Sequence, residues 1–133
     1  MQFAPYISFL AVMAALTMAA CQNTAPVTQD PVRYYGLQTG LLDNDLVQFH
    51  VTLSGTQSTE QVARHAAECA AAQYTLIRGF GFARHVRTRI GQQADRLSAD
   101  AVYKISRSLP QGTKTIDAEV VADACARDNI PMV

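Results

Sequence analysis

The clearest alternation of hydrophobic and polar residues lies in residues 46–53, LVQFHVTL. The hydrophobic positions share one face of an extended chain: Val47, Phe49, Val51 and Leu53. Polar residues fill the positions between them: Gln48, His50 and Thr52. Because successive side chains of a strand point to opposite faces of a sheet, this pattern predicts a strand that is buried on one face only.

A helix is expected soon after this strand. Ser58 and Gln61 have the spacing of a capping box, in which the two side chains bind free backbone N–H groups at the start of a helix. The helix would extend to about Gln73, with small or apolar residues on its inner face: Val62, Ala66, Cys69 and Ala70. Alanine side chains are short, so this helix is expected to lie close to a sheet.

Three further strands are predicted in the second half of the chain. Residues 74–89 are rich in aromatic and β-branched residues and predict one long strand with a bend at its glycines. Its apolar face would consist of these residues: Tyr74, Leu76, Phe80, Phe82 and Val86. Residues 101–109 and 113–124 predict a hairpin around a tight turn at Pro110 and Gly112. The final strand of this hairpin would bury alternate residues: Ile116, Ala118, Val120 and Ala122.

These elements follow the order β-α-β-β-β. They predict an α+β fold in which one helix packs on a mainly antiparallel four-stranded sheet, because that arrangement buries the apolar faces of helix and sheet against each other. Residues 34–45 contain several turn-forming residues and are interpreted as a loop at the edge of the domain. The sequence therefore predicts a single α+β domain over residues 34–133.

The first twenty residues differ from the rest because they contain no Asp, Glu, Lys or Arg. Residues 3–20 are predominantly apolar and end in small residues, as the hydrophobic region and cleavage site of a secretory signal peptide do. The sequence Met18-Ala19-Ala20-Cys21 resembles the lipobox of bacterial lipoproteins, with Met18 where leucine is usual. The resemblance implies that residues 1–20 are a signal peptide that is removed and that the thiol of Cys21 carries a lipid.

Two alternative interpretations of the apolar segment stay open at this point. Its length is near the lower limit for a helix that spans a bilayer, so an uncleaved membrane helix is one of them. The other is cleavage by the ordinary signal peptidase and soluble secretion, although Met18 fits the usual Ala-x-Ala pattern poorly.

The residues that follow Cys21 predict how the domain is attached to the membrane. Residues 21–33 begin with the lipidated cysteine, continue as a polar segment with two prolines, and are expected to form a flexible tether. In enteric lipoproteins an Asp after the cysteine favours retention in the inner membrane, so Gln22 favours the outer membrane. The expected location is the cell envelope, with the domain in the periplasm.

The charges are balanced overall but not locally. The chain has 11 Lys and Arg residues and 11 Asp and Glu residues, so its net charge of zero argues against a general nucleic-acid-binding protein. Residues 78–107, in contrast, contain seven Lys and Arg residues and only two Asp. Among them His85, Arg87 and Arg89 alternate and are expected on one face of a strand, where they could bind an anionic envelope polymer or an acidic partner. The alternative is an ordinary solvated strand end.

Two cysteines remain when Cys21 is lipidated, Cys69 and Cys125. An exported domain of this size often contains a disulfide, so we expect these two residues to be paired; two unpaired, buried cysteines are the alternative. The three histidines have none of the HxH or HExxH spacings, and the cysteines no CxxC spacing, so neither a metal nor another cofactor is expected. No serine lies in a G-x-S-x-G motif and the carboxylates are scattered, so no catalytic residue is predicted.

The lipobox and the tether occur together with the segments FHVTLSG, AAECAAAQYTLI, ARHVRTR and KTIDAEV. In this combination the chain is similar to small lipoproteins of Gram-negative bacteria. The resemblance implies an envelope protein attached to a membrane through its lipid, and it transfers no catalytic or ligand-binding residue. The leading prediction is a non-enzymatic interaction or structural module that works with another envelope protein. The alternative is an accessory, enzymatic or not, that binds an anionic envelope polymer through the basic strand.

Overall fold

A computed structural model describes residues 29–131 of the chain. The predicted signal peptide and Cys21 lie outside the described residues. The helices and strands follow one another in this order: β1 (Arg33–Leu41), β2 (Leu46–Ser54), α1 (Glu60–Ile77), β3 (Phe82–Gln93), β4 (Arg96–Ser106), β5 (Thr115–Asp117) and α2 (Ala118–Arg127). The five strands form one sheet with the order β1-β2-β4-β3-β5, and every pairing is antiparallel.

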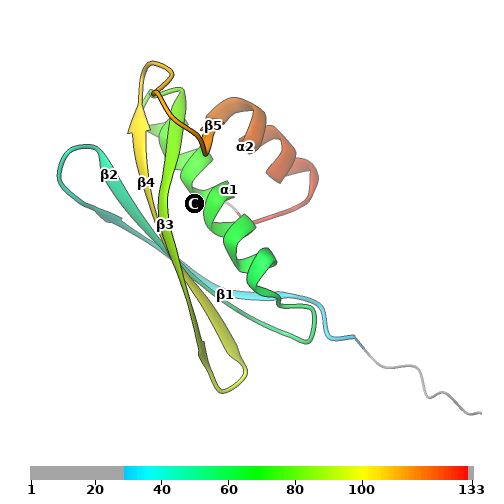
Figure 1. Ribbon diagram of the computed structural model, residues 1–133. Helices are drawn as coiled ribbons and strands as arrows, with labels where there is room; N and C mark the ends of the chain where they lie inside the picture. Colours follow the sequence, from blue (N-terminus) through cyan, green and yellow to red (C-terminus); the bar gives the residue numbers. More distant parts are fainter. Residues whose placement is uncertain (1–28, 132–133) are drawn as a thin grey trace, which may run out of the picture.

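The elements are arranged in three layers (Figure 1). The sheet is the first layer, and α1 lies along one of its faces, in contact with β2, β4 and β3. The third layer is α2, which packs on α1 and on the short strand β5. Both helices are therefore on the same side of the sheet, and we call the opposite side of the sheet the open face.

The predicted α+β class is confirmed, although residues 29–131 form a sheet of five strands rather than four and two helices rather than one. The strand predicted at residues 46–53 is confirmed as β2, and all its apolar residues at alternate positions are buried. The N-cap of the helix after it lies one residue later than the capping box predicted. Thr59 rather than Ser58 is the N-cap, and its hydroxyl accepts a hydrogen bond of 3.2 Å from the N–H of Val62.

The loop predicted at residues 34–45 is confirmed for residues 42–45 and wrong for the part before them, because residues 33–41 form the strand β1. This strand lies at the edge of the sheet and pairs only with β2. It contributes few side chains to the core, mainly those of Tyr34 and Leu37. An edge strand that buries so little apolar surface leaves only a weak alternation in the sequence, so its turn-forming residues dominated the prediction.

The first part of the long strand predicted at residues 74–89 is helical, because α1 continues to Ile77. Gly79 follows the helix in a left-handed conformation, with a φ angle of 73°. The N–H of Phe80 then donates to the carbonyl group of Thr75 over 2.9 Å, which completes a glycine-dependent helix cap. Glycine adopts this conformation without the steric strain that a Cβ would cause. Gly79 therefore ends a helix, and β3 begins only after it.

The final strand predicted at residues 113–124 is also wrong, because the helix α2 begins at Ala118. The carboxylate of Asp117 caps this helix by accepting hydrogen bonds from the N–H groups of Glu119 and Val120, at 3.0 and 3.2 Å. The buried residues of α2 recur at helical spacing: Ala118, Ala122 and Cys125. Val120, which the strand prediction placed in the core, is 66% exposed. The predicted hairpin is wrong as well, because β5 pairs with β3 and not with β4.

The core lies between α1 and the strands β2 and β4. The inner face of α1 consists mostly of alanine: Ala63, Ala66, Ala67, Ala70 and Ala71. Larger side chains fill the space from the sheet side, with Phe49, Leu53 and Ile105 buried. Small residues on the helix and large residues on the strands therefore complement each other across this interface.

Candidate functional site

The two cysteines of the domain form a disulfide that links α1 to α2. The sulfur atoms of Cys69 and Cys125 are 2.04 Å apart, and the Cα atoms are 5.8 Å apart. Both side chains are completely buried. The predicted pairing is confirmed. It depends on α2 being a helix, because helical spacing places Cys125 on the same buried face as Ala118 and Ala122.

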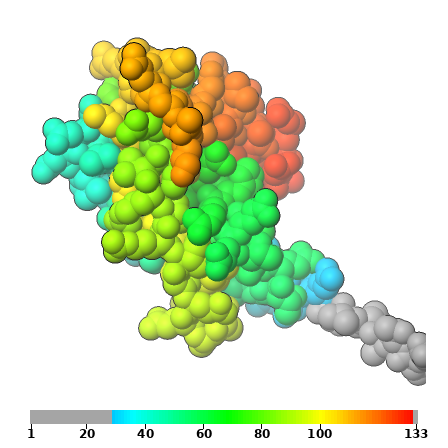
Figure 2. All heavy atoms as spheres, in the orientation of Figure 1, coloured from blue at the N-terminus to red at the C-terminus, as the bar shows by residue number. Residues whose placement is uncertain are grey.

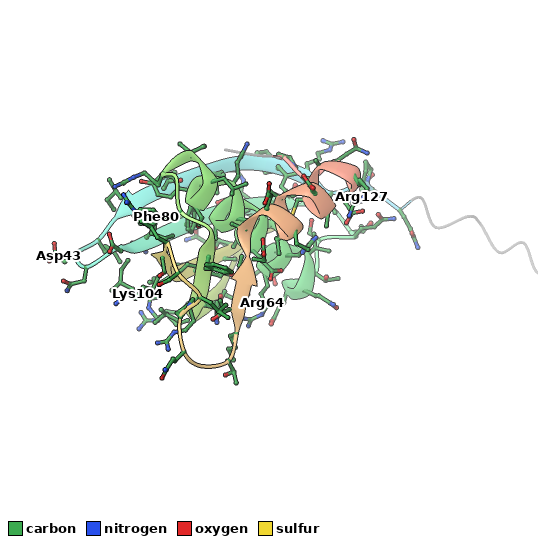
Figure 3. The ribbon with its side chains drawn as sticks, turned by 90° about the horizontal axis from the view of Figure 1, so that it is seen from above. Asp43, Arg64, Phe80, Lys104 and Arg127 are labelled. Carbon is green, nitrogen blue, oxygen red and sulfur yellow. A yellow bond between two sulfur atoms is a disulfide. The ribbon has the colours of Figure 1, made fainter. Side chains whose placement is uncertain are left out.

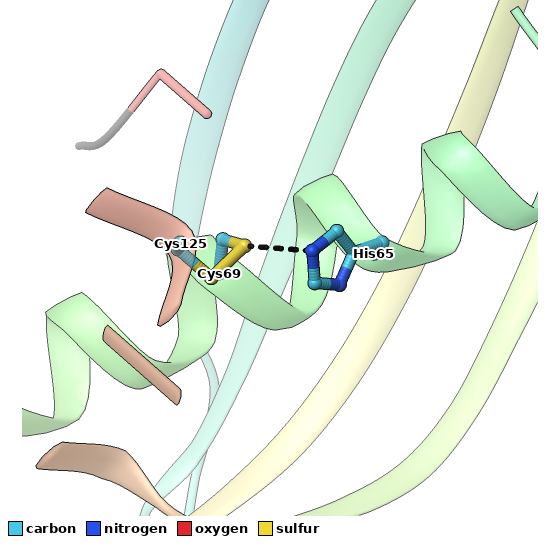
Figure 4. A group of neighbouring side chains, drawn as sticks. All are labelled: His65, Cys69 and Cys125. Atoms are coloured by element: carbon cyan, nitrogen blue, oxygen red, sulfur yellow. Dashed lines mark hydrogen bonds between the residues drawn. A yellow bond between two sulfur atoms is a disulfide. The ribbon is translucent and has the colours of Figure 1, made fainter. Parts of the chain in front are cut away.

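His65 lies beside this disulfide, one helical turn before Cys69 (Figure 4). Its Nε2 is 3.8 Å from Sγ of Cys69 and 4.0 Å from a carboxylate oxygen of Asp128, and its Nδ1 is 3.5 Å from a carboxylate oxygen of Glu68. The possible ligand atoms of His65, Cys69 and Cys125 lie within 4.8 Å of one another. The two sulfur atoms are bonded to each other, however, and zinc binds thiolates. In its oxidised form this cluster is therefore a structural link and not a metal site.

Strand β3 contains a β-bulge between His85 and Arg87, and this bulge changes which residues share a face. His85 lies opposite Tyr103 of β4, which belongs to the core, whereas Arg87 lies opposite Val102, the next residue of β4. One extra residue on β3 therefore inverts the alternation. The common face predicted for His85, Arg87 and Arg89 is wrong: His85 is on the helix side, and the two arginines are on the open face.

The open face carries one ion pair and several exposed cations. Nη1 of Arg87 is 3.4 Å from Oδ1 of Asp100, and the side-chain amide of Gln48 donates to Oδ2 of Asp100 over 2.7 Å. Two partners thus already occupy this carboxylate. Arg89 and Lys104 lie on the same face, and both are exposed. The structure therefore leaves part of the predicted basic strand available to an anion, but without His85.

A polar cleft with a volume of about 480 Å³ opens on the helix side of the sheet. Charged and polar side chains from three elements line it: Arg64 and Glu68 of α1, His85 and Thr88 of β3, and Lys114 directly before β5. Figure 2 views the molecule from the side on which these three elements meet. In Figure 3, Arg64 lies on the helix side of the sheet and Lys104 on the other.

The surroundings of His85 favour its neutral form. Burial lowers the pKa of this imidazole, and the positive charges of Lys114 and Arg64 lower it further, against a smaller opposite effect of Glu68. Its Nε2 lies 2.7 Å from the hydroxyl oxygen of Thr88. The two cations thus lower the pKa of this imidazole by more than Glu68 raises it.

Tyr103 forms the inner wall of the cleft beside His85. The two rings meet edge to face, with their centroids 5.2 Å apart, and Tyr103 makes a second such contact with Phe49 in the core. Burial raises the pKa of the Tyr103 phenol, and the nearby charge of Glu68 raises it further, so this group stays neutral. The cleft thus combines a buried aromatic wall with a charged rim.

Lys114 occupies its place in the cleft through an unusual backbone conformation. Its φ angle is 64°, in the left-handed region that residues with a Cβ rarely adopt. Its carbonyl group accepts a hydrogen bond of 2.9 Å from the N–H of His85, which joins the segment before β5 to the bulged part of β3. Glycine or asparagine would adopt this conformation with less strain, and such strain concentrates at functional sites. Lys114 is therefore a candidate functional residue.

The sequence prediction included only one residue of this cleft, His85, and assigned it to a different surface. The charged residues of the cleft are Arg64 and Glu68, which lie one helical turn apart on α1, and Lys114, which lies far from them in the chain. Only the tertiary structure brings Lys114 and His85 to these two residues. The left-handed position of Lys114 and the bulge beside His85 have no sequence signature in this chain either.

The model of one protein family, the YNQ4 C-terminal domain, matches residues 34–129. This chain belongs to that family. The matched residues include both helices and all five strands apart from the first residue of β1. No curated protein and no solved structure matches the chain.

The family name states no activity, and the geometry of this YNQ4 C-terminal domain is the guide to its function. Neither helix of the described part of the chain is long and apolar enough to cross a membrane. The two surfaces with an unusual arrangement of charge are the open face and the helix-side cleft. They lie on opposite sides of the sheet, and β3 contributes to both.

Proposed function

We propose that this protein is a membrane-anchored envelope lipoprotein whose periplasmic domain is a non-enzymatic interaction module. The observation that supports the location best is the buried disulfide between Cys69 and Cys125, because disulfides persist in oxidising compartments such as the periplasm. The apolar first twenty residues and the lipobox-like sequence that ends at Cys21 support export and lipidation. The residue after it, Gln22, favours the outer membrane over the inner one.

The open face is the surface proposed for interaction with another envelope component. Both described helices lie on the other side of the sheet, so this face is available to a partner (Figure 1). Polar and charged side chains cover it, which favours a hydrophilic partner over a second hydrophobic protein surface. Those side chains belong to regular strands and need no rearrangement to be presented.

A more specific candidate function is the binding of an anionic envelope polymer, such as lipopolysaccharide, by the same face. Arg89 and Lys104 are exposed there, while Asp100 is already engaged by Arg87 and Gln48. Among residues 29–131 neither Arg89 nor Lys104 has a carboxylate oxygen within 4.0 Å, and guanidinium and ammonium groups are suited to phosphate groups. This observation favours a polyanion over an uncharged polysaccharide.

Lipidation is tested by expressing the full chain and its Cys21→Ser variant in a Gram-negative host. We expect wild type to lose residues 1–20 and to carry acyl chains on Cys21, as seen by mass spectrometry and by incorporation of labelled palmitate. The variant should remain unprocessed and unlabelled. An unmodified Cys21 inside a soluble wild-type product would contradict the proposal.

Polyanion binding is tested by retention of the purified full chain on immobilised lipopolysaccharide at two salt concentrations. We expect retention that weakens as salt rises and that weakens further in the double variant Arg89→Gln, Lys104→Gln. Arg127→Gln, on the far helix, is the matched control and should bind like wild type. Equal retention of wild type and the double variant would eliminate this function and leave the protein-binding one.

A further inference from the structure

The helix-side cleft is an open depression whose lining carries more positive than negative side chains. Arg64 and Lys114 face it, and the one carboxylate on its wall, Glu68, is 3.5 Å from His65. The contact of Arg64 with Glu60 is loose, because the two charged groups are 3.8 Å apart and 48% of the arginine side chain is exposed. Both cations therefore remain able to contact a bound ligand.

Three features of the backbone direct polar groups into this cleft. The bulge in β3 turns His85 to the helix side, and the hydroxyl group of Thr88 lies 2.7 Å from its Nε2. Bulges often re-aim a side chain in this way beside a functional site. The left-handed conformation at Lys114 places a lysine where the backbone would favour glycine. The hydrogen bond from the N–H of His85 to the carbonyl of Lys114 couples these two irregular positions.

We propose that this cleft binds a small organic ligand through an oxyanion group, either a carboxylate or a phosphate. Arg64 and Lys114 would bind the oxyanion, and the Thr88–His85 pair would donate or accept hydrogen bonds beside it. The volume of about 480 Å³ exceeds that of an inorganic anion and lies within the usual range of small-molecule sites. Tyr103 and Ile116 provide apolar surface for the rest of the ligand. This site is separate from the open face, which would bind a polymer.

Inorganic phosphate and acetate serve as probes because the natural ligand is not identified. Each anion is titrated, at constant ionic strength, into the purified full chain with labelled histidine, and the imidazole signals are followed by NMR. We expect the signal of His85 to shift in a saturable manner and its pKa to rise, because a bound negative charge offsets Lys114 and Arg64. His50 lies on the open face and reports binding there, so a shift of His50 without a shift of His85 would place the anion on the open face and contradict the cleft.

Two variants remove the proposed contacts one at a time: Lys114→Gln and Arg64→Gln. Each should weaken anion binding by about tenfold or more, as expected when a charge-assisted hydrogen bond is lost. Lys104→Gln, which removes a cation from the open face, should bind the probes like wild type. Thermal melts check that the variants are folded, and Arg64→Gln tests the proposal even where Lys114→Gln fails to fold, because Arg64 lies on the exposed side of a helix.

A response to phosphate alone would indicate a phosphate ester as ligand, and a response to both anions would include carboxylic acids. The proposal is overturned where neither anion shifts the His85 signal, or where folded Lys114→Gln and Arg64→Gln bind both probes as tightly as wild type. The double variant Arg89→Gln, Lys104→Gln separates this site from the polyanion surface. It should lose retention on lipopolysaccharide and keep the saturable shift of His85.

Discussion

The two faces of the same sheet are stabilised in different ways. On the helix side, β2 and β4 present large apolar side chains such as Phe49 and Ile105, and the alanines of α1 pack against them. On the open face, the same two strands present mostly polar residues around the buried Val102, and Asp100 binds Gln48 and Arg87. On the helix side, the volume of a side chain therefore determines whether it fits against α1. On the open face, its charge and hydration are more important.

Strand β3 differs from β2 and β4 because a bulge divides its basic residues between the two faces. Its bulge allows it to present His85 on the helix side and Arg87 and Arg89 on the open face within five residues. The comparison shows that one inserted residue is enough to divide a basic strand between two surfaces with separate chemistry. The following experiments perturb the two faces one at a time.

The largest effect is expected from removal of the disulfide, which lies entirely on the helix side. Replacing Cys69 and Cys125 by alanine opens a link between residues that are 56 positions apart. In the chain-entropy model the free energy of unfolding should fall by about 4 kcal/mol. Urea unfolding of the full chain measures this loss. A reductant should lower the midpoint of wild type and leave that of the double variant unchanged, and equal midpoints of the two proteins without reductant would contradict the expectation.

A larger side chain should destabilise the protein more on the helix side than on the open face. Ala70 of α1 is fully buried against the sheet, so Ala70→Leu should lower the free energy of unfolding by about 1–3 kcal/mol. Lys104→Leu introduces the same side chain on the open face and should change it by less than about 0.5 kcal/mol. Thermal and urea unfolding compare the two variants. Equal effects would mean that the alanine face of α1 does not limit the distance between helix and sheet.

The ion pair of the open face should contribute less to stability than to binding. Asp100→Asn removes the charge that faces Arg87, and because this pair is partly exposed the free energy of unfolding should change by less than about 1 kcal/mol. The same variant frees a guanidinium group, so retention on lipopolysaccharide should increase. Weaker retention than wild type would show that Asp100 itself takes part in binding.

The smallest effect concerns the pH dependence of stability on the helix side. Because the pKa of folded His85 lies below its ordinary value of 6.5, the unfolded chain binds this proton more readily than the folded one. The contribution of His85 to stability is then fully present above pH 6.5, and stability declines as the pH falls from there through the lowered pKa of His85 in the folded protein. His85→Gln should reduce this decline, whereas His50→Gln, on the open face, should retain it. Identical pH profiles of wild type and His85→Gln would contradict the expected shift.

The predictable parts of the fold are those in which one interaction dominates the local pattern. β2 shows strict alternation because it is buried on one face and lies inside the sheet between β1 and β4, and α1 combines a capping residue with alanines at helical spacing. The pairing of Cys69 with Cys125 follows from their number once Cys21 is assigned to lipidation. In each case the residues that carry the information lie close together in sequence or are few enough to pair in one way.

The parts predicted wrongly are those in which two local interpretations fit the same residues. Ala118, Val120 and Ala122 alternate as a strand would, but Ala118, Ala122 and Cys125 also recur as a helix requires. The cap at Asp117 and the burial of Cys125 against α1 favour the helix, and both depend on the folded arrangement. The prediction of a loop at β1 is wrong for a related reason. This edge strand is stabilised mainly by its pairing with β2 and only a little by burial of its own hydrophobic residues.

Local hydrophobic periodicity and residue chemistry were thus sufficient for the α+β class, the strand β2, the first helix and the disulfide. They were insufficient for the bulge in β3 and for the cleft. Register within a sheet is decided by the neighbouring strands, and an extra residue reverses every side chain on one side of it without leaving a trace in the composition. Arg64, His85 and Lys114 share a site only because α1, β3 and β5 pack together, so the candidate ligand-binding cleft is a property of the tertiary structure.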